Sequence, residues 1–314
     1  MAPKVLAVTG PTATGKTRLG VELALRHNGE VVSADSMQVY RRMNVGTAKP
    51  SPEEMCGVPH HMIDVAEPWE AYSVARYVTE ATAKMDDILS RNKLPILVGG
   101  TGLYLDSLLS GRTFAPHFPE GDCRARLCRR AAREGNGALY AELQRVDPQS
   151  AKHLHPNDAK RIIRALEVFY ETGETIWVYN QKTKRLPPRY DALRIALSFS
   201  DRAHLKARIG QRVDKMMENG LFKEVSALLL EGLSPQCTAM QAIGYKEMAV
   251  AVTGSVSPLA AAEDIKLRSR QYAKRQLTWL RKNPSIRWIL WDAEPNFQLA
   301  LHDSTKYMKE FGLL

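Results

Sequence analysis

Residues 5–17, Val-Leu-Ala-Val-Thr-Gly-Pro-Thr-Ala-Thr-Gly-Lys-Thr, decide the fold of this 314-residue chain. The apolar run Val5–Thr9 predicts a buried strand, and Thr17–Arg26 has the pattern of a helix. The segment between them fits G-x-x-x-x-G-K-[ST], a loop that holds phosphate with its backbone N–H groups and with the N-terminus of the following helix. We therefore expect a phosphate site formed by Gly10, Pro11, Thr12, Ala13, Thr14, Gly15, Lys16 and Thr17.

Two side chains at the end of this loop carry its chemistry. Lys16 supplies a positive charge to a bound phosphate, and the Thr17 hydroxyl is a ligand for Mg²⁺. The pattern leaves open whether the phosphate belongs to a nucleoside triphosphate or to a diphosphate ester. It predicts a phosphate site with Mg²⁺ at Thr17, and no more specific ligand.

The segments after the loop alternate between strand and helix. Val31–Ala34 and Leu94–Val98 are short apolar runs, and Tyr72–Arg91 between them has the spacing of an amphipathic helix with Ser73 as its N-cap. Short buried strands separated by helices favour a parallel sheet. The predicted fold class is α/β, a P-loop NTPase-like parallel sheet flanked by helices. Later elements of the same fold are expected at Arg194–Leu197, His204–Asn219, Lys223–Leu230 and Trp288–Trp291.

The strand pattern stops between about residues 114 and 188, where helical segments dominate and prolines mark both ends. We therefore predict an inserted all-helical subdomain, residues 116–188, within a core formed by residues 1–115 and 189–314. Its expected helices are Asp122–Glu134, Gly137–Val146, Pro148–Leu154 and Asn157–Thr172, the last with Asp158 near its start and Gly173 after it.

Composition excludes several classes of protein. Hydrophobic residues make up 44% of the chain and charged residues 25%, which is typical of a globular protein and excludes disorder as its main state. No apolar run approaches the roughly 20 residues of a membrane span, and no signal peptide is visible, so a cytoplasmic protein is expected. Four cysteines in so long a chain predict reduced thiols.

The net charge of +10 favours a polyanionic partner. Between Lys266 and Arg287 there are eight basic residues and no acidic ones, and helical spacing predicts a core-facing stripe of Ile265, Tyr272 and Trp279. A single cluster of this kind can be the solvated face of a helix. Three clusters together favour a nucleic acid. The other two are Arg124, Arg126, Arg129, Arg130 and Arg133, and Lys160, Arg161 and Arg164.

The residues alone leave a second function open. A P-loop fold with an arginine-bearing helical insertion is typical of small-molecule and nucleotide kinases. Against a kinase, the strand Leu94–Val98 ends in Gly99-Gly100-Thr101, without the aspartate that usually holds Mg²⁺ there. Asp35 instead closes the strand Val31–Ala34, at the sheet edge where ligands of such folds bind. Its carboxylate can serve as a base or as a metal contact.

Seven segments, taken in order, resemble a known family. They are residues 10–17, 35–40, 46–50, 59–61 and 99–104, then Asp158 with 161–166, and residues 273–279. Together they resemble the bacterial tRNA dimethylallyltransferase family over nearly the whole chain. The resemblance implies transfer of a dimethylallyl group from dimethylallyl diphosphate to the exocyclic N6 of adenosine 37, beside the anticodon of certain tRNAs.

The resemblance also implies roles for the residues of the site. The P-loop would hold the leaving diphosphate, with Lys16, Thr17 and Mg²⁺ stabilising the charge that develops on it. Asp35 matches the general base that receives the N6 proton. Thr101 matches a threonine near the reacting groups, and Arg208 or Arg212 matches an arginine that lines the diphosphate site.

For the tRNA, the resemblance implies an adenine extruded into the protein and met by Asp35, Ser36, Met37 and Gln38 together with Thr101. The helical insertion would grip the anticodon stem, and a monomer would suffice. Further contacts with the anticodon arm are expected at Arg124, Lys160, Arg161, Arg164, Gln241, Gly244, Tyr245, Lys246, Lys274 and Arg275.

Overall fold

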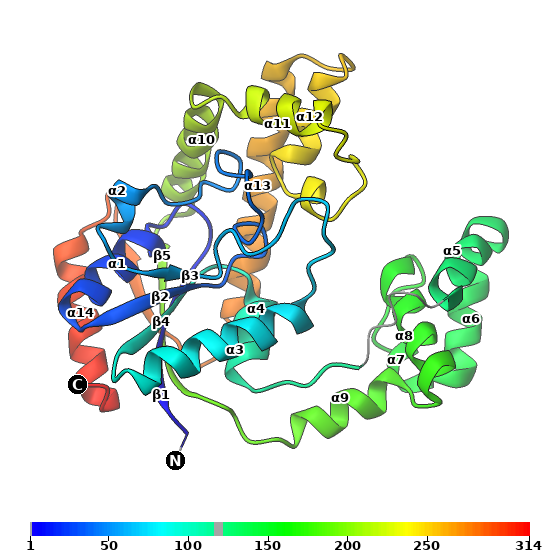
Figure 1. Cartoon of the computed structure of the whole chain (residues 1–314), viewed down its shortest axis with the longest axis horizontal. Helices are drawn as coiled ribbons and strands as arrows, with labels where there is room; N and C mark the ends of the chain where they lie inside the picture. The colour runs from blue at the N-terminus through cyan, green and yellow to red at the C-terminus, as the bar shows by residue number, and fades with distance from the viewer. Residues whose placement is uncertain (1, 116–121) are drawn as a thin grey trace. The chain divides into compact units, whose positions relative to one another are not determined.

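The computed structural model describes residues 2–115 and 122–314 of the chain. The chain divides into two compact units, Met1–Leu109 with Arg189–Leu314, and Ser110–Pro188 (Figure 1). The second unit starts six residues before the expected insertion and ends at the same residue. Where the chain leaves and re-enters the first unit, the Tyr190 N–H donates to the Leu109 carbonyl at 3.3 Å, so the two crossings lie side by side.

A six-stranded sheet forms the centre of the first unit. All neighbouring strands are parallel, in the order β3-β2-β4-β1-β5-β6. This confirms the predicted fold class. The strands are β1 (Lys4–Thr9), β2 (Gly29–Ser33), β3 (His60–His61), β4 (Leu94–Val98), β5 (Asp191–Phe199) and β6 (Arg287–Trp291).

Alternate residues of each central strand enter two different cores. Val5 and Ala7 of β1 pack with the helices of one face, whereas Leu6 and Val8 pack with those of the other. One face is covered by α3 (Val74–Ser90), α4 (Gly102–Leu109), α11 (Leu221–Leu230) and α12 (Tyr245–Val252). The other is covered by α1 (Lys16–Arg26) and α14 (Phe297–Phe311), which lie beside each other in Figure 1. Both cores receive residues from α10 (Arg202–Glu218) and α13 (Pro258–Leu280).

The strand order places a ligand crevice at the carboxyl ends of β1 and β4. These neighbouring strands lead the chain in opposite directions, from β1 toward β2 and from β4 toward β5. Ligands of open α/β sheets bind at such a switch point. The P-loop follows β1, Gly99–Thr101 follows β4, and Asp35 follows β2, so the three predicted site segments lie at the same edge.

The second unit has its own helical core. Leu127, Leu139, Leu143 and Ile162 are all buried there. Its longest helix ends at Thr172 as predicted but begins at Ala159, two residues later than expected, because Asp158 caps the first turn through the Arg161 N–H. Gly173 ends the helix in a left-handed conformation. The helices are α5 (Asp122–Glu134), α6 (Asn136–Val146), α7 (Pro148–Ala151), α8 (Ala159–Thr172) and α9 (Ile176–Lys184).

The predicted core-facing stripe on α13 is wrong at Trp279. Ile265 is buried as expected, but the Trp279 side chain is 40% exposed. A seven-residue repeat slips about 20° per heptad around an α-helix, so by the end of α13 the buried face has moved away from it. That face continues instead through Gln276, Leu277 and Leu280. The indole of Trp279 packs over Gly102 and donates to Asp106 at 2.7 Å.

No helix in the described part of the chain combines the length and apolar character that a bilayer span requires.

A buried carboxylate, that of Glu30, lies beside the sheet. The Glu30 side chain on β2 is 3% exposed and pairs with Arg91, Lys93 and His61 at 2.5 to 2.8 Å. Hydrogen bonding to Arg91, then to Lys93 and His61, holds the pKa of Glu30 well below its usual range.

We predict that Glu30→Gln lowers the free energy of unfolding by about 2–3 kcal/mol at pH 7, because the cations of Arg91 and Lys93 lose a buried partner. A depressed folded-state pKa gives stability that is present above the unfolded pKa of about 4.3 and is lost as pH falls. The difference between wild type and variant in urea unfolding should therefore shrink below about pH 4. Glu22→Gln, which removes the exposed pair with Arg18, is the control and should cost under about 0.5 kcal/mol. Equal effects of the two substitutions would contradict the role of Glu30.

Candidate active site

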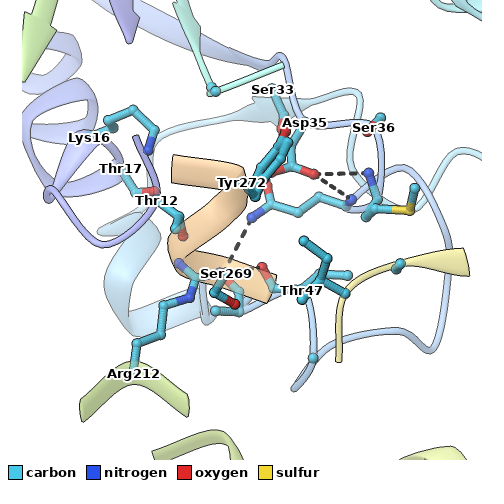
Figure 2. Close-up of a pocket in the computed structure, with 18 of the residues that line it drawn as sticks. Thr12, Lys16, Thr17, Ser33, Asp35, Ser36, Thr47, Arg212, Ser269 and Tyr272 are labelled. Carbon is cyan, nitrogen blue, oxygen red and sulfur yellow. Dashed lines mark hydrogen bonds between the residues drawn. The ribbon is translucent and has the colours of Figure 1, made fainter. Parts of the chain in front are cut away.

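A cavity of about 340 Å³ opens at the carboxyl edge of the sheet in the first unit (Figure 2). The P-loop, the segment after β2, the loop 46–50 and the helices α10 and α13 all contribute to its wall. Predicted site residues in this wall are Thr12, Lys16, Thr17, Asp35, Ser36, Met37, Gln38, Arg212, Gln241 and Arg275. The structure thus brings together residues that are up to 263 positions apart in the sequence.

The P-loop is held in a shape that presents its backbone N–H groups. Gly10 has φ +142°, and a Cβ there would lie 2.3 Å from the Leu197 carbonyl oxygen, so only glycine fits. The Thr14 hydroxyl donates back to the Pro11 carbonyl at 2.9 Å. Within the described chain, the N–H groups of residues 13–17 have no hydrogen-bond acceptor. Unbonded N–H groups at the start of a helix form an anion site.

Residues from the end of the chain support this loop. The Trp291 indole donates to the Thr14 carbonyl at 3.0 Å. The ring of Phe297 covers Gly15, where a Cβ would lie 2.6 Å from the ring. Both contacts leave the cavity side of the loop open.

Lys16 lies against its own loop. Its Nζ donates to the Pro11 carbonyl at 2.7 Å. The pKa of Lys16 is lowered to about 7, mainly by burial and also by the nearby charge of Arg212, while the charge of Asp35 partly opposes both effects. An anion bound in the loop would favour the charged ammonium, so Lys16 is suited to a ligand that brings negative charge.

The structure separates the two candidate arginines on α10. Arg212 lines the cavity, and Figure 2 shows it reaching from α10 toward the same space as Thr12 and Lys16. Its guanidinium donates to the Thr47 carbonyl at 3.2 Å, and burial lowers its pKa while the charge of Asp35 opposes that shift. Arg208, one turn earlier, is not part of the cavity wall and lies 3.6 Å from Glu294.

Asp35 is fixed on one side and open on the other. Its Oδ1 accepts hydrogen bonds from the N–H groups of Met37 at 2.9 Å and Gln38 at 3.4 Å, as in an Asx turn. Its Oδ2 has no hydrogen bond among the described residues, so it can accept a proton or a hydrogen bond from a ligand. Thr101 stands behind this segment, outside the cavity wall, and its hydroxyl accepts from the Ser36 N–H at 3.2 Å.

Two polar cavity residues on α13 that sequence reasoning missed make contacts at the site. Tyr272 was expected in the core, yet it lines the cavity and its ring lies beside Asp35 in Figure 2. Burial, with the charge of Asp35, raises the pKa of Tyr272 to about 12, so the phenol stays neutral. Gln276 is 7% exposed and hydrogen-bonds to the turns after β1 and β4. A lone glutamine on the buried face of a basic helix is the signal that could have found it.

The loop that follows the Asp35 segment is held by another missed residue, Glu224 on α11. Its carboxylate accepts from the N–H groups of Asn44, Val45 and Gly46 at 2.9 to 3.2 Å, and from the Tyr245 hydroxyl at 2.5 Å. Tyr245 is fully buried and packs on Gly46. This tyrosine, expected at the tRNA, thus supports the cavity wall from behind.

The other predicted tRNA residues near α12 and α13 vary in exposure. Gln241 lines the cavity and donates to the Pro235 carbonyl at 2.8 Å. The Gly244 N–H donates to Glu247, and Lys246 and Lys274 are exposed. Arg275 lines the cavity and lies over the Tyr272 ring at 5.6 Å. Nearer the start of α13, Lys266 pairs with Asp214 and Glu263, so part of the basic row is neutralised within the protein.

The second unit contains the remaining predicted tRNA residues. Arg124 and Arg164 both pair with Glu167, which is 1% exposed, so their charges balance a buried carboxylate. Arg161 pairs with Asp158 at the start of α8. Lys160 is exposed and has no ion pair among the described residues.

The chain is similar to known proteins over most of its length. Residues 38–283 match the family model "IPP transferase", and residues 3–67 match "Isopentenyl transferase". A tRNA dimethylallyltransferase of Thermoanaerobacter sp. (strain X514) is 45% identical over 98% of both chains. That of Geobacter sulfurreducens is 46% identical over 98% of this chain and 97% of its own.

Solved structures give the same result. A tRNA isopentenylpyrophosphate transferase from Bacillus halodurans superposes with a TM-score of 0.73 and 39% identity over 98% of both chains. A eukaryotic dimethylallyltransferase acting on tRNA has a TM-score of 0.80 and 30% identity, covering 98% of this chain and 78% of that one. The resemblance found in the sequence is confirmed, and this chain belongs to the IPP transferase family.

Proposed function

We propose that this enzyme transfers a dimethylallyl group from dimethylallyl diphosphate to N6 of adenosine 37 in tRNA, releasing diphosphate. The observation that carries the proposal is that one cavity joins an anion-binding P-loop to the open oxygen of Asp35. Relatives named tRNA dimethylallyltransferase support the reaction class. Because these relatives are 45% and 46% identical over 98% of this chain, the kinase alternative from the sequence is not retained.

The P-loop side of the cavity fits the donor. The N–H groups of residues 13–17 and the charges of Lys16 and Arg212 would hold the diphosphate and stabilise the negative charge that grows as its C–O bond breaks. No group of three or more His, Cys, Asp or Glu side chains that could hold a metal occurs among the described residues. The Thr17 hydroxyl in the cavity wall would be one ligand of Mg²⁺, with diphosphate oxygens and water as the others, and the ion would neutralise charge on the leaving group.

The Asp35 side fits the acceptor. The N6 nitrogen would attack the allylic carbon as diphosphate leaves, and Asp35 Oδ2 would take the proton that N6 loses. An exocyclic amine is a weak nucleophile, so both its placement and removal of its proton contribute to the rate. Ser36, Met37 and Gln38 line the wall beside it, and the Gln38 amide is bonded to the Ser33 hydroxyl and to the Ala48 carbonyl.

An adenine in an anticodon loop reaches such a cavity only after it is unstacked and extruded. Exposed basic residues, above all Lys160, Arg161 and Lys274, would hold the tRNA backbone. Each molecule would act as a monomer in the cytoplasm, where its tRNA substrate is found.

The direct test supplies purified protein, Mg²⁺ and an unmodified tRNA with either dimethylallyl diphosphate or ATP. The RNA is then digested and its nucleosides identified by mass. Prenylated adenosine formed only with the diphosphate is the expected result. An unmodified RNA together with ATP consumption on a small acceptor would restore the kinase alternative.

For the proton acceptor, we predict that Asp35→Asn lowers kcat by about 10²- to 10⁴-fold, because the amide keeps the bonds to Met37 and Gln38 but cannot take a proton. The Kd for tRNA, measured by filter binding, should stay at the wild-type value. Asp292→Asn, an exposed carboxylate, is the control. Equal loss of binding and turnover in Asp35→Asn would contradict the assignment.

For Lys16, we predict that diphosphate binding takes up a proton above about pH 7, because the lowered pKa rises when the anion binds. Calorimetry with inorganic diphosphate and Mg²⁺ at pH 8, in two buffers of different ionisation enthalpy, measures this uptake. Lys16→Arg stays charged and should show less proton uptake than wild type at pH 8 and the same uptake at pH 6. Identical uptake in both proteins at pH 8 would assign the protons to diphosphate alone.

For the tRNA, we predict that the pair Lys160→Ala and Arg161→Ala weakens binding and lowers the slope of log K against log salt by about one to two, because two phosphate contacts are lost. The kcat at saturating tRNA should not change. Lys309→Ala on α14 serves as the exposed control. An unchanged salt slope in the double variant would exclude this surface.

A further inference from the structure

The side chain of Gln276 bridges two turns at the edge of the sheet. Its Oε1 accepts from the Thr12 N–H at 3.0 Å, and its Nε2 donates to the Gly100 carbonyl at 2.9 Å. Thr12 belongs to the turn after β1, and Gly100 to the turn after β4. Gln276 is 7% exposed and comes from α13, so a buried polar side chain from a distant helix joins the two turns.

Each of these turns adjoins the residues proposed to bind one of the two substrates. Thr12 directly precedes the unbonded N–H groups of residues 13–17, which form the anion site. Gly100 directly precedes Thr101, whose hydroxyl accepts from the Ser36 N–H, and Ser36 is the neighbour of Asp35. Two hydrogen bonds of Gln276 and one of Thr101 thus connect the donor side of the cavity to the acceptor side.

Packing leaves the carboxamide little freedom. A Cβ at Gly100 would lie 2.2 Å from Gln276 Nε2 and 3.2 Å from the Gly10 carbonyl oxygen. The close approach of α13 to the β4 turn therefore requires glycine at position 100. A side chain held so tightly transmits a displacement of either turn to the other.

We propose that Gln276 is a positioning residue of the transfer reaction, which sets the spacing between the P-loop and the Asp35 segment. The proposal rests on the proposed function. Attack by N6 requires the allylic carbon and the nitrogen to approach within about 3–3.5 Å in line, and an error of about 1 Å in such a geometry can cost about 100-fold in rate. Gln276 contributes no proton and binds no substrate atom in this role.

The role demands one acceptor and one donor in fixed places. Methionine has nearly the shape of glutamine but makes neither hydrogen bond. A glutamate carboxylate can still accept from Thr12 but cannot donate to Gly100, whereas a protonated glutamic acid can do both. Burial next to a bound diphosphate raises the pKa of such a glutamate, so the neutral form would become populated as pH falls.

The first experiment compares Gln276→Met with wild type in kcat, in the Kd for tRNA, in the Kd for inorganic diphosphate and in Tm. We expect kcat to fall by about 10- to 100-fold, while both Kd values stay within about two-fold and the protein remains folded at the assay temperature. A wild-type kcat in Gln276→Met would overturn the proposal. So would a loss of diphosphate affinity that equals the loss of kcat, because Gln276 would then only shape the anion site.

The second experiment follows the ratio of kcat in Gln276→Glu to kcat in wild type between about pH 6 and 8.5 at saturating substrates. The ratio should rise as pH falls, because the neutral acid restores the bond to Gly100. Taking the ratio removes the titration of every group that both proteins share. Gln298→Glu, on the exposed side of α14, is the control and should give a ratio near one at every pH. A ratio for Gln276→Glu that does not change with pH would overturn the proposal.

A double-mutant cycle keeps the proposal testable if one variant folds poorly. Gly100→Ala should reduce kcat in the wild-type background and cost less in the Gln276→Ala background, where the clash with Nε2 is gone. Additive effects would show that the two residues act separately. Failure of the wild-type enzyme to prenylate tRNA would instead remove the proposed function, and every comparison above includes that measurement.

Discussion

The contacts that later segments make with the P-loop, two hydrogen bonds and one packed ring, are the constraint on which the rest of the site depends. A loop with several unbonded N–H groups is costly on its own, because each buried donor without an acceptor loses about 1–3 kcal/mol. Here the loop is fixed by Trp291 at the Thr14 carbonyl, by the ring of Phe297 on Gly15, and by Gln276 at the Thr12 N–H. All three come from the last elements of the chain. The phosphate site is therefore completed by residues such as Gln276 and Trp291, which lie 264 and 277 positions after their partners in the loop.

The topology of the sheet explains why the P-loop and the Asp35 segment line the same cavity. Because β1 and β4 are neighbours that send the chain in opposite directions, the turns after them face a common space. β2, on the other side of β4, adds the Asp35 segment to the same edge. Behind that edge, Glu224 and Tyr245 fix the loop that carries Thr47, to which Arg212 is bonded. Substrate-binding groups are thus held by strand ends and by buried partners, and few of them rest on exposed loops.

The sequence was sufficient wherever a local pattern determines the structure. Five of the six strands, the phosphate loop, the Ser73 cap and the caps of α8 at Asp158 and Gly173 all follow from neighbours in the chain, whereas the two-residue strand β3 was not predicted. Contacts between distant segments could not be predicted. The cavity position of Tyr272 and the bridge made by Gln276 depend on how α13 crosses the sheet edge, and Trp279 lies outside the core because the helix repeat slips along its length. In the same way, the pairing of Arg124 with buried Glu167 appears only once α5 packs on α8.

The adjacent crossings at Leu109 and Tyr190 have a consequence for the evolution of this enzyme. The chain leaves the sheet-bearing unit after Leu109 and returns to it near Tyr190, and these two residues are joined by one hydrogen bond. The helical unit is therefore an insertion at a single place in the sheet-bearing unit. An insertion of this kind can be lengthened, shortened or exchanged without altering the order of the strands. The part of the chain outside the catalytic cavity can therefore change at a different pace from the part that performs the reaction, and a shared core can accompany insertions of different size and charge.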